Sequence, residues 1–413
     1  MQDNEKKPAL RFKGFTDPWE QRKLGELVEI GDIDHRMPET VADGIPYLMT
    51  GDFVGTNELN FDGTKMISEE DYCQLSQKIK PEKGDILFAR YASVGAARYV
   101  DFTRKFLISY SCAIIKKSKK INSKYLYHFI TSGKVQQQIK LEINTGSQAN
   151  IGIDSMKNHI VVSMPPLEEQ TKIADALSNL DHLITLHQRK YEKLVNIKKS
   201  MLDKMFPKNG ASVPEIRFKG FTDLWEQRKL EEYLEVSGQK NFEGIYTKED
   251  VLSVSGDFGI VNQIEFQGRS FAGASVANYG VVETGDIVYT KSPLKSNPYG
   301  IIKANKGKNG IVSTLYAVYK PKQSANPEFV QNYFEQDARM NNYMHPLVNK
   351  GAKNDMKVSA ENALKGQIVF PDIKEQRTIS EFFRNLDTLI TLHQRKLEKL
   401  QNIKKSCLEK MFV

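Results

Sequence analysis

The sequence has little of what would place it in several common protein classes. It contains three cysteines among 413 residues, Cys73, Cys112 and Cys407, and their spacing fits neither a zinc motif nor a disulfide framework. We therefore expect reduced thiols with no special role. No apolar run reaches the length of a signal peptide or of a membrane-spanning helix. This absence leads us to expect a cytoplasmic protein.

Motifs of common enzymes are also missing. There is no GxxxxGK[ST] phosphate loop, no HExxH zinc motif and no glycine-rich cofactor loop after a strand. The run SNPYG from Ser296 resembles the (N/D)PP(Y/F) motif of amino-methyltransferases but lacks its second proline. We interpret Asn297 and Pro298 as turn residues. We expect a chain that performs no catalysis and has no metal site.

The overall composition is that of a folded protein with an anionic partner. Hydrophobic residues make up 40% and charged residues 27% of the chain, which is typical of a globular protein. The formal net charge is +8. Such an excess of Lys and Arg favours nucleic acid as a partner, although the signal is weak by itself.

The strongest feature of the sequence is one unit used twice. RFKGFTD begins at Arg11 and again at Arg217, and LITLHQRK begins at Leu183 and again at Leu389, so both pairs are 206 residues apart. Two similar halves in tandem tend to associate about a pseudo-twofold axis. The second RFKGFTD follows the first long helix directly, so we expect the N-terminal segment to lie near the end of the last helix.

Between these repeated segments lie two regions of short apolar runs broken by Gly, Pro, Asn and Asp. Such runs are typical of strands, and a helical pattern over residues 123–142, with a counterpart over 327–343, interrupts them. We predict an α+β domain in each half. The GDI strand occurs in both, as GDILFAR at Gly84 and GDIVYTK at Gly285, whereas the loops around it differ almost completely. One fold that presents two different binding surfaces would have this pattern.

The candidate contact residues come from these unlike loops. Their Arg, Lys, Asn, Gln, Ser and Tyr side chains suit phosphate contacts and base edges, although most polar loop residues are simply solvated. The candidates are Arg90, Tyr91, Ser93, Ser109, Tyr110, Ser111, Ser147, Gln148, Asn150, Lys291, Ser292, Lys295, Asn297, Lys350, Lys353 and Asn354.

Each half ends in a helical pattern of about 40 residues, which corresponds to a rod of roughly 60 Å. Apolar residues recur at alternating steps of three and four, which predicts a coiled-coil seam between the two copies. The seam includes Leu180, Ile184, His187, Leu194, Leu386, Ile390, His393 and Leu400. We predict antiparallel helices, with parallel packing as the alternative that the sequence leaves open. We interpret the two seam histidines as packed or hydrogen-bonded core residues rather than ligands. Lys198 and Lys404 on the seam indicate a place where the coil separates or meets a partner.

These patterns divide the chain into six parts. The predicted parts are an N-terminal scaffold segment (1–27), a first strand-rich domain (28–164), a first long helix (165–206), a linker with the repeated scaffold segment (207–235), a second strand-rich domain (236–370) and a second long helix (371–413).

This order of parts resembles the specificity subunit of type I restriction-modification systems over nearly the whole chain. The resemblance rests on the RFKGFTD and WEQRKL segments, the GDI elements, the PLEEQ and PDIKEQ helix starts and the LITLHQRK seam. It implies two target recognition domains that each read one half of an asymmetric bipartite sequence in double-stranded DNA. The second helix start has lost the double proline of the first, but Pro371 remains to begin the helix.

The resemblance also implies partners. Two methyltransferase subunits, which use S-adenosylmethionine for adenine methylation, and restriction subunits, which use ATP and Mg²⁺, would supply the catalysis. This chain would bind no cofactor. Two alternatives stay open: a coiled-coil scaffold with two protein-binding domains, and a self-contained DNA methyltransferase.

Overall fold

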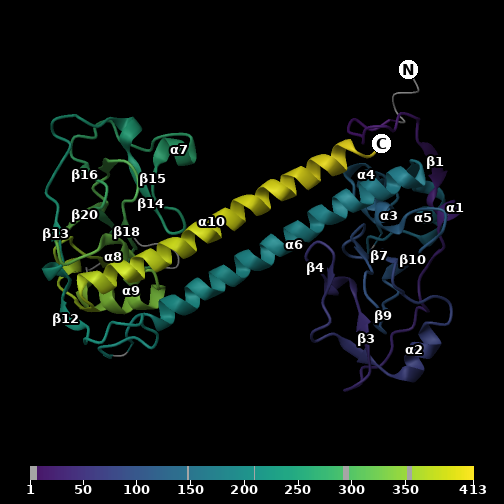
Figure 1. The fold of residues 1–413 in the computed structure, drawn as a ribbon, viewed down its shortest axis with the longest axis horizontal. Coiled ribbons are helices and arrows are strands. Elements are labelled where there is room, and N and C mark those ends of the chain that lie inside the picture. The colour runs from purple at the N-terminus through teal and green to yellow at the C-terminus, as the bar shows by residue number, and fades with distance from the viewer. Residues whose placement is uncertain (1–6, 147, 209, 292–296, 351–355) are drawn as a thin grey trace. The chain divides into compact units, whose positions relative to one another are not determined.

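The computed structural model describes residues 7–146, 148–208, 210–291, 297–350 and 356–413 (Figure 1). Contacts divide the chain into two compact units. The first unit contains the chain up to Lys190 together with His393–Val413, and the second is Tyr191–Leu392. Neither long helix, nor any other helix in these described ranges, is both long and apolar enough to cross a membrane.

In the part of the first unit that the structure describes, there are several small sheets and five short α-helices. A four-stranded antiparallel sheet has the order β2-β10-β7-β8, a three-stranded sheet has the order β6-β3-β9, and β1 pairs with β11 and β4 with β5. The strands are β1 (Glu20–Lys23), β2 (Ile30–Gly31), β3 (Ile45–Leu48), β4 (Phe53–Val54), β5 (Glu58–Leu59), β6 (Lys65–Ile67), β7 (Ile86–Ala89), β8 (Ala97–Tyr99), β9 (Leu107–Ile108), β10 (Cys112–Ile115) and β11 (Val161–Met164). The helices are α1 (Leu24–Leu27), α2 (Glu69–Leu75), α3 (Ser123–Ile130), α4 (Gly133–Leu141) and α5 (Ile153–His159).

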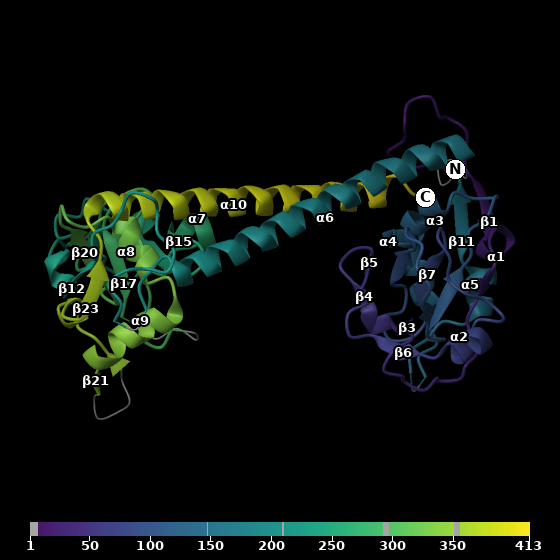
Figure 2. The ribbon, with the colours of Figure 1, turned by 60° about the horizontal axis from the view of Figure 1, so that its bottom comes forward.

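The second unit repeats the central sheet and differs around it. In the described residues, its four-stranded sheet has the order β13-β20-β17-β18, and two-stranded sheets pair β12 with β23, β14 with β15, β16 with β19 and β21 with β22. Figure 2 shows β12 and β23 next to each other. The strands are β12 (Glu226–Lys229), β13 (Leu234–Val236), β14 (Leu252–Ser255), β15 (Gly259–Asn262), β16 (Gly280–Val282), β17 (Ile287–Thr290), β18 (Ile302–Ala304), β19 (Gly310–Val312), β20 (Tyr316–Pro321), β21 (Asn349–Lys350), β22 (Met356–Lys357) and β23 (Gln367–Phe370). The helices are α7 (Gln263–Gln267), α8 (Pro327–Tyr333) and α9 (Asp337–Met344).

The predicted helix over residues 123–142 is in fact two helices. The chain leaves α3 at Thr131, whose hydroxyl donates to the carbonyls of Tyr127 and His128 at 3.1 and 3.0 Å, and α4 starts again at Gly133. The counterpart over 327–343 divides in the same way into α8 and α9. The hydroxyl side chains and the glycine at positions 131–133 weaken a helix interior, and the apolar periodicity does not register this; the second break, at residues 334–336, contains neither.

The GDI motif has a structural role in both sheets. Its aspartates, Asp85 and Asp286, are buried, and each accepts the backbone N–H three residues earlier, from Glu82 and Glu283, at 2.8 Å. The preceding glycines, at 84 and 285, have φ of +100° and +93°, in the left-handed region that favours glycine. The motif therefore makes the tight turn that leads into the central strand, β7 or β17.

The two long helices are α6 (Leu167–Lys204) and α10 (Ile373–Lys410), of 38 residues each. In the first unit, Asp181 pairs with Lys404 at 2.5 Å and His187 with His393 at 2.8 Å. Contacts move backward along α10 as they move forward along α6, so the helices are antiparallel, as predicted. In the second unit, Lys198 pairs with Asp387 at 2.8 Å, which repeats the Asp181–Lys404 pair with the roles of the helices exchanged.

Each seam lysine thus has a carboxylate partner on the facing helix. Lys404 and Lys198 are about one-tenth and one-fifth exposed at their side chains. An unpaired charge at such a position would be strongly destabilising. These pairs contradict the expectation that the coil separates at the two lysines, and the alternative expectation, that the lysines meet a partner subunit, stays a prediction.

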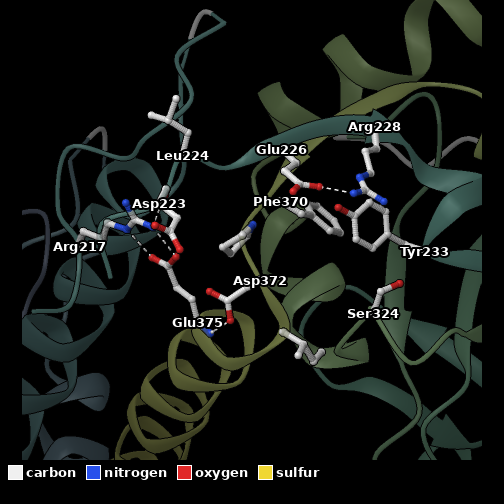
Figure 3. A pocket seen from close by; sticks show the side chains of 12 residues that line it. Arg217, Asp223, Leu224, Glu226, Arg228, Tyr233, Ser324, Phe370, Asp372 and Glu375 are labelled. Carbon is white, nitrogen blue, oxygen red and sulfur yellow. Dashed lines mark hydrogen bonds and ion pairs between the residues drawn. The ribbon is translucent and has the colours of Figure 1, made fainter. Parts of the chain in front are cut away.

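A bidentate ion pair joins each repeated segment to a long helix. The Arg11 guanidinium donates to both carboxylate oxygens of Glu169 at 2.7 and 2.8 Å, and Arg217 does the same to Glu375 at 2.7 and 2.8 Å (Figure 3). Both glutamates are fully buried. The next residue in each helix, Gln170 or Gln376, links the helix start to the short helix α3 or α8 by accepting the backbone N–H of its cap residue at 2.9 Å.

The end of each long helix enters a core built mainly from the other half of the sequence. Phe412 packs in the first unit against Tyr125 and Phe129, with 5.6 Å between ring centroids in both cases. Its repeat counterpart, Phe206, packs in the second unit against Phe329 at 5.5 Å. The backbone N–H of Leu10 donates to Lys410 at 2.9 Å, which confirms the expected proximity of the N-terminal segment to the end of the last helix.

Replacing Phe412 or Phe206 with alanine tests these contacts. Both side chains are 1% exposed, so each truncation should leave a cavity and lower the free energy of unfolding of its unit by about 3–5 kcal/mol. Urea denaturation of the full chain measures the loss. Leu224→Ala is the matched control, because Leu224 is 71% exposed and should change stability by less than about 0.5 kcal/mol. Losses for both phenylalanine variants as small as the control would refute the packing described.

Candidate nucleic-acid interface

Three loops that the sequence analysis singled out meet in the first unit. The backbone N–H groups of Arg90 and Tyr91 donate to the Ser111 carbonyl at 2.9 and 3.3 Å, and the Ile151 N–H donates to the Arg90 carbonyl at 3.1 Å. Tyr91 also forms an isolated β-bridge with Asn150. The loops after β7, before β10 and before α5 therefore form one surface, which we call the first loop cluster.

Arg90 lies inside this cluster rather than on it. It is 6% exposed, its Nη1 pairs with the Asp32 carboxylate, and its Nε donates to the Ile151 carbonyl at 3.0 Å. A guanidinium in these contacts holds two loops against the sheet. At this buried position Arg90 supports the loop surface rather than contacting a ligand directly.

Asp32, His35 and Lys78 belong to the same cluster and were not among the sequence candidates. Asp32 is 5% exposed and accepts from His35 Nε2 at 2.9 Å and from Lys78 Nζ at 3.2 Å. Burial by itself would raise the pKa of Asp32. The His35 hydrogen bond and the charges of Arg90 and Lys78 outweigh burial and hold this pKa below its ordinary value.

The cluster has a polar and aromatic rim. The His35 ring stacks on Tyr110, with centroids 5.0 Å apart and an interplanar angle of 23°. The side chains of His35 and Lys78 are 58% and 68% exposed. A sequence signal for these residues did exist, because DIDHR directly follows a short buried strand, but nothing in it indicated that Arg90 would be the partner of Asp32.

The loop after β7 is also strained. Ala92 has φ of +58°, a left-handed conformation that costs a non-glycine residue on the order of 1 kcal/mol. Strained backbone is common at functional sites because the surrounding structure holds it in place.

The other candidates of the first unit differ in exposure. Ser93 and Gln148 are exposed, and Tyr91, Tyr110, Ser111 and Asn150 are partly buried. Ser109 is buried and supports the loop, since its hydroxyl accepts the Ser111 N–H at 3.3 Å. Ser147 lies outside the described residues.

In the second unit the corresponding surface carries a different charge arrangement. Lys291 follows β17 as Arg90 follows β7, but Gly238 stands at the position of Asp32, because Val236 and Ile30 occupy the same register of the two sheets. Burial, followed by the charge of Lys240, lowers the pKa of Lys291. Two lysines near one another favour an anionic ligand such as phosphate.

The turn predicted at Asn297 is present. The Gly300 N–H donates to the Asn297 carbonyl at 3.0 Å, and Asn297 itself is 7% exposed. Gly300 has φ of +82°, and a Cβ there would lie 1.8 Å from the Thr290 carbonyl oxygen, so only glycine fits. Of the other candidates, Lys350 lies in β21, and Ser292, Lys295, Lys353 and Asn354 fall outside the described residues.

The seam candidates lie along the two helices. Ile184 and Leu400 are 5% and 7% exposed and pack with Leu397 and Leu180 in the first unit. In the second unit, Leu386 and Leu194 join the main core, and Ile390 is partly buried.

The two seam histidines form a hydrogen bond with each other. The Nδ1 atoms of His187 and His393 are 2.8 Å apart, so one ring donates and the other accepts. Burial, then the charges of His393, Lys396 and Lys190, lowers the pKa of His187, which favours a neutral ring.

A cavity of about 250 Å³ in the second unit is a poor candidate for DNA. Its lining places the carboxylates of Asp223, Glu226, Asp372 and Glu375 around Arg217 and Arg228 (Figure 3). The Arg217 guanidinium is held by Glu375, and Arg228 pairs with Glu226. The carboxylates outnumber the guanidinium groups, so the cavity does not favour phosphate.

Comparisons with known proteins identify relatives of the chain. Residues 16–196 match the family model described as type I restriction modification DNA specificity domain. The chain is 24% identical to the putative type I restriction enzyme MjaX specificity subunit of Methanocaldococcus jannaschii, over 95% of this chain and 92% of the relative. It is 22% identical to the type I restriction enzyme EcoKI specificity subunit of Escherichia coli, over 85% of this chain and 79% of the relative.

The fold also has a solved counterpart. The crystal structure of the type I restriction-modification system S subunit from M. genitalium matches with a TM-score of 0.62 at 16% identity, over 98% of this chain and 99% of that chain. This likeness shows that the two proteins share a fold.

Replacing Asp32 with asparagine tests how the first loop cluster is held. The change leaves the buried Arg90 without its counter-charge, and breaking such a pair should cost about 3 kcal/mol in the free energy of unfolding. Denaturation of the full chain measures this loss. Asp43→Asn, at an exposed position outside the cluster, is the control and should change stability by less than about 0.5 kcal/mol. Equal stability of the two variants would contradict a supporting role for the pair.

Proposed function

We propose that the whole chain, of which residues 16–196 match the type I restriction modification DNA specificity domain model, is the sequence-specific DNA-recognition subunit of a type I restriction-modification complex. The observation that carries this proposal is the pairing of a nearly identical scaffold with unlike loops. Each half has its own four-stranded sheet of equivalent strand order, and the loop after the GDI strand extends from it. This loop region contains the Asp32–Arg90 pair in the first half and Lys240 and Lys291 in the second.

The target is therefore an asymmetric bipartite sequence in double-stranded DNA. Each strand-rich domain reads one half-site, and because their loops differ, the half-sites differ. The coil between the repeated segments sets the length of the spacer. An α-helix rises 1.5 Å per residue, so a change in helix length changes the spacing in small defined steps.

Catalysis falls to partner subunits in this proposal. Two methyltransferase subunits use S-adenosylmethionine to methylate adenine, and restriction subunits use ATP and Mg²⁺ to cleave unmodified DNA. This chain directs both activities to the target and binds none of these cofactors itself. The complex acts in the cytoplasm.

The methyltransferase subunits dock on the coil. Leu183 and Leu389 occupy the same position of the two repeats and are 39% and 43% exposed, and the same holds for Leu186 and Leu392 at 38% and 58%. Exposed leucines on a helix surface favour a protein partner. Because the two patches are identical, they suit two copies of one partner.

Methylome sequencing tests the proposed function. Cells that express the chain with its methyltransferase partner should carry methylated adenine in one asymmetric bipartite sequence. Adding one helical turn, about 5.4 Å, at matched places in α6 and α10 should lengthen the spacer by about one or two base pairs and leave both half-sites unchanged. Altered half-sites with an unchanged spacer would contradict the proposal that the coil sets the spacer length. Methyl transfer by the purified chain alone would contradict the proposal that partner subunits perform the catalysis.

Charge substitutions in the leucine patches test docking. Leu183→Glu should remove one of two bound methyltransferase subunits, Leu389→Glu the other, and the double variant both, because a buried carboxylate without a partner is strongly unfavourable. Native mass spectrometry of the co-expressed complex counts the subunits. Leu315→Glu, at a 62% exposed leucine that belongs to neither α6 nor α10, should leave two bound. Full binding to the double variant would rule out these patches.

A further inference from the structure

We infer that His35 makes a base-specific contact in the first half-site and that Arg90 positions it through Asp32. The inference rests on the proposed function, since the ligand is duplex DNA. Residue type alone would favour Arg90 over His35 as the residue that contacts a base, because arginine is the usual choice for such a contact. The inference assigns the contact to His35 instead.

The geometry separates the two residues clearly. Arg90 and Asp32 both have side chains that are 7% exposed, and the Arg90 Nε is engaged by the Ile151 carbonyl. His35 instead has a side chain that is 58% exposed, although it bonds to the same carboxylate at 2.9 Å. Asp32 therefore joins a buried anchor to an exposed ring.

The ring is held in a defined orientation. Nε2 bonds to Asp32 on one side, the backbone N–H of His35 donates to Asp34 Oδ1 at 2.8 Å, and the ring face stacks on Tyr110. A side chain fixed before binding loses little conformational entropy in the complex. This arrangement distinguishes His35 from an ordinary solvated loop residue.

The fixed orientation also determines the chemistry of the free edge. An ionised Asp32 can only accept, so Nε2 carries the proton, and in the neutral tautomer with Nε2–H the Nδ1 atom is left as an acceptor. In the major groove, an acceptor is complementary to the amino group of adenine N6 or cytosine N4. Lys78, with a side chain 68% exposed beside the same carboxylate, can contact a neighbouring phosphate.

The arrangement occurs in the first domain, and the described residues at the corresponding positions of the second domain do not repeat it. Gly238 replaces Asp32, and Asn241, at the repeat position of His35, is 3% exposed and donates to the Tyr246 carbonyl at 2.8 Å. A scaffold contact would be expected in both halves, as the Arg–Glu pairs are. A contact specific to one half-site should occur in one domain.

Binding of the assembled complex to a panel of duplexes tests the inference. Each duplex carries one base-pair change in the target found by methylome sequencing. His35→Ala should weaken binding to the target about 10-fold or more and remove discrimination at one base pair of the first half-site, with the second half-site unaffected. His35→Gln, which keeps an acceptor, should restore part of both.

His159→Ala is the matched control. The His159 side chain is also 58% exposed and also bonds to a carboxylate, Glu142, at 2.5 Å, but it lies in α5 outside the cluster. This variant should bind like the wild type. Thermal unfolding of His35→Ala should stay close to that of the wild type, because Asp32 keeps Arg90 and Lys78 as partners when the His35 hydrogen bond is lost.

Three results would overturn the inference. They are unchanged binding by His35→Ala, an equal loss on every duplex, which indicates a phosphate contact, and lost discrimination in the second half-site. The proposed function fails in a different way, because then the wild-type complex itself shows no preference for any duplex in the panel.

Discussion

A bidentate ion pair between the repeated arginine and the glutamate near the start of a long helix holds each half of the sequence to its helix. Arg11 with Glu169 and Arg217 with Glu375 have the same geometry, and both glutamates are fully buried. A buried carboxylate needs a well-placed partner, so neither segment can move without the other. The segment before each strand-rich domain and the helix after it are thus held as one frame, and the loops vary on that frame.

The frame also explains why each core needs both halves of the sequence. Phe412 and Phe206 complete cores whose other members come mostly from the opposite repeat, and the pairs Asp181–Lys404 and Lys198–Asp387 fix the register of the facing helices. Buried ionic groups in a coil are best understood as devices that select one register and orientation. A shift by one turn would separate both lysines from their carboxylates.

Much of this frame was predictable from sequence, because it is built from the repeated segments and from the periodic apolar residues of the long helices. The antiparallel helices and the proximity of Leu10 to Lys410 followed from LITLHQRK and RFKGFTD. The break between α3 and α4 was not predictable in this way, because the spacing of apolar residues does not reveal that the Thr131 hydroxyl bonds to a carbonyl of its own helix. The partner of Arg90 could not be predicted either, since Asp32 is 58 residues away in the chain, and residue type placed the arginine at the surface. The roles of His35 and Lys78 depend on that one long-range contact.

The near-identity of the repeated segments has a consequence for inheritance. Segments that match letter for letter at a constant offset can be encoded by similar stretches of DNA, and where they are, homologous recombination can join two genes. A crossover within RFKGFTD or LITLHQRK would exchange one strand-rich domain whole. The Arg–Glu ion pair, the core contacts of Phe206 or Phe412 and the helix seam would then form again from equivalent residues. New combinations of half-sites could then arise in a single event, with no intermediate that fails to fold.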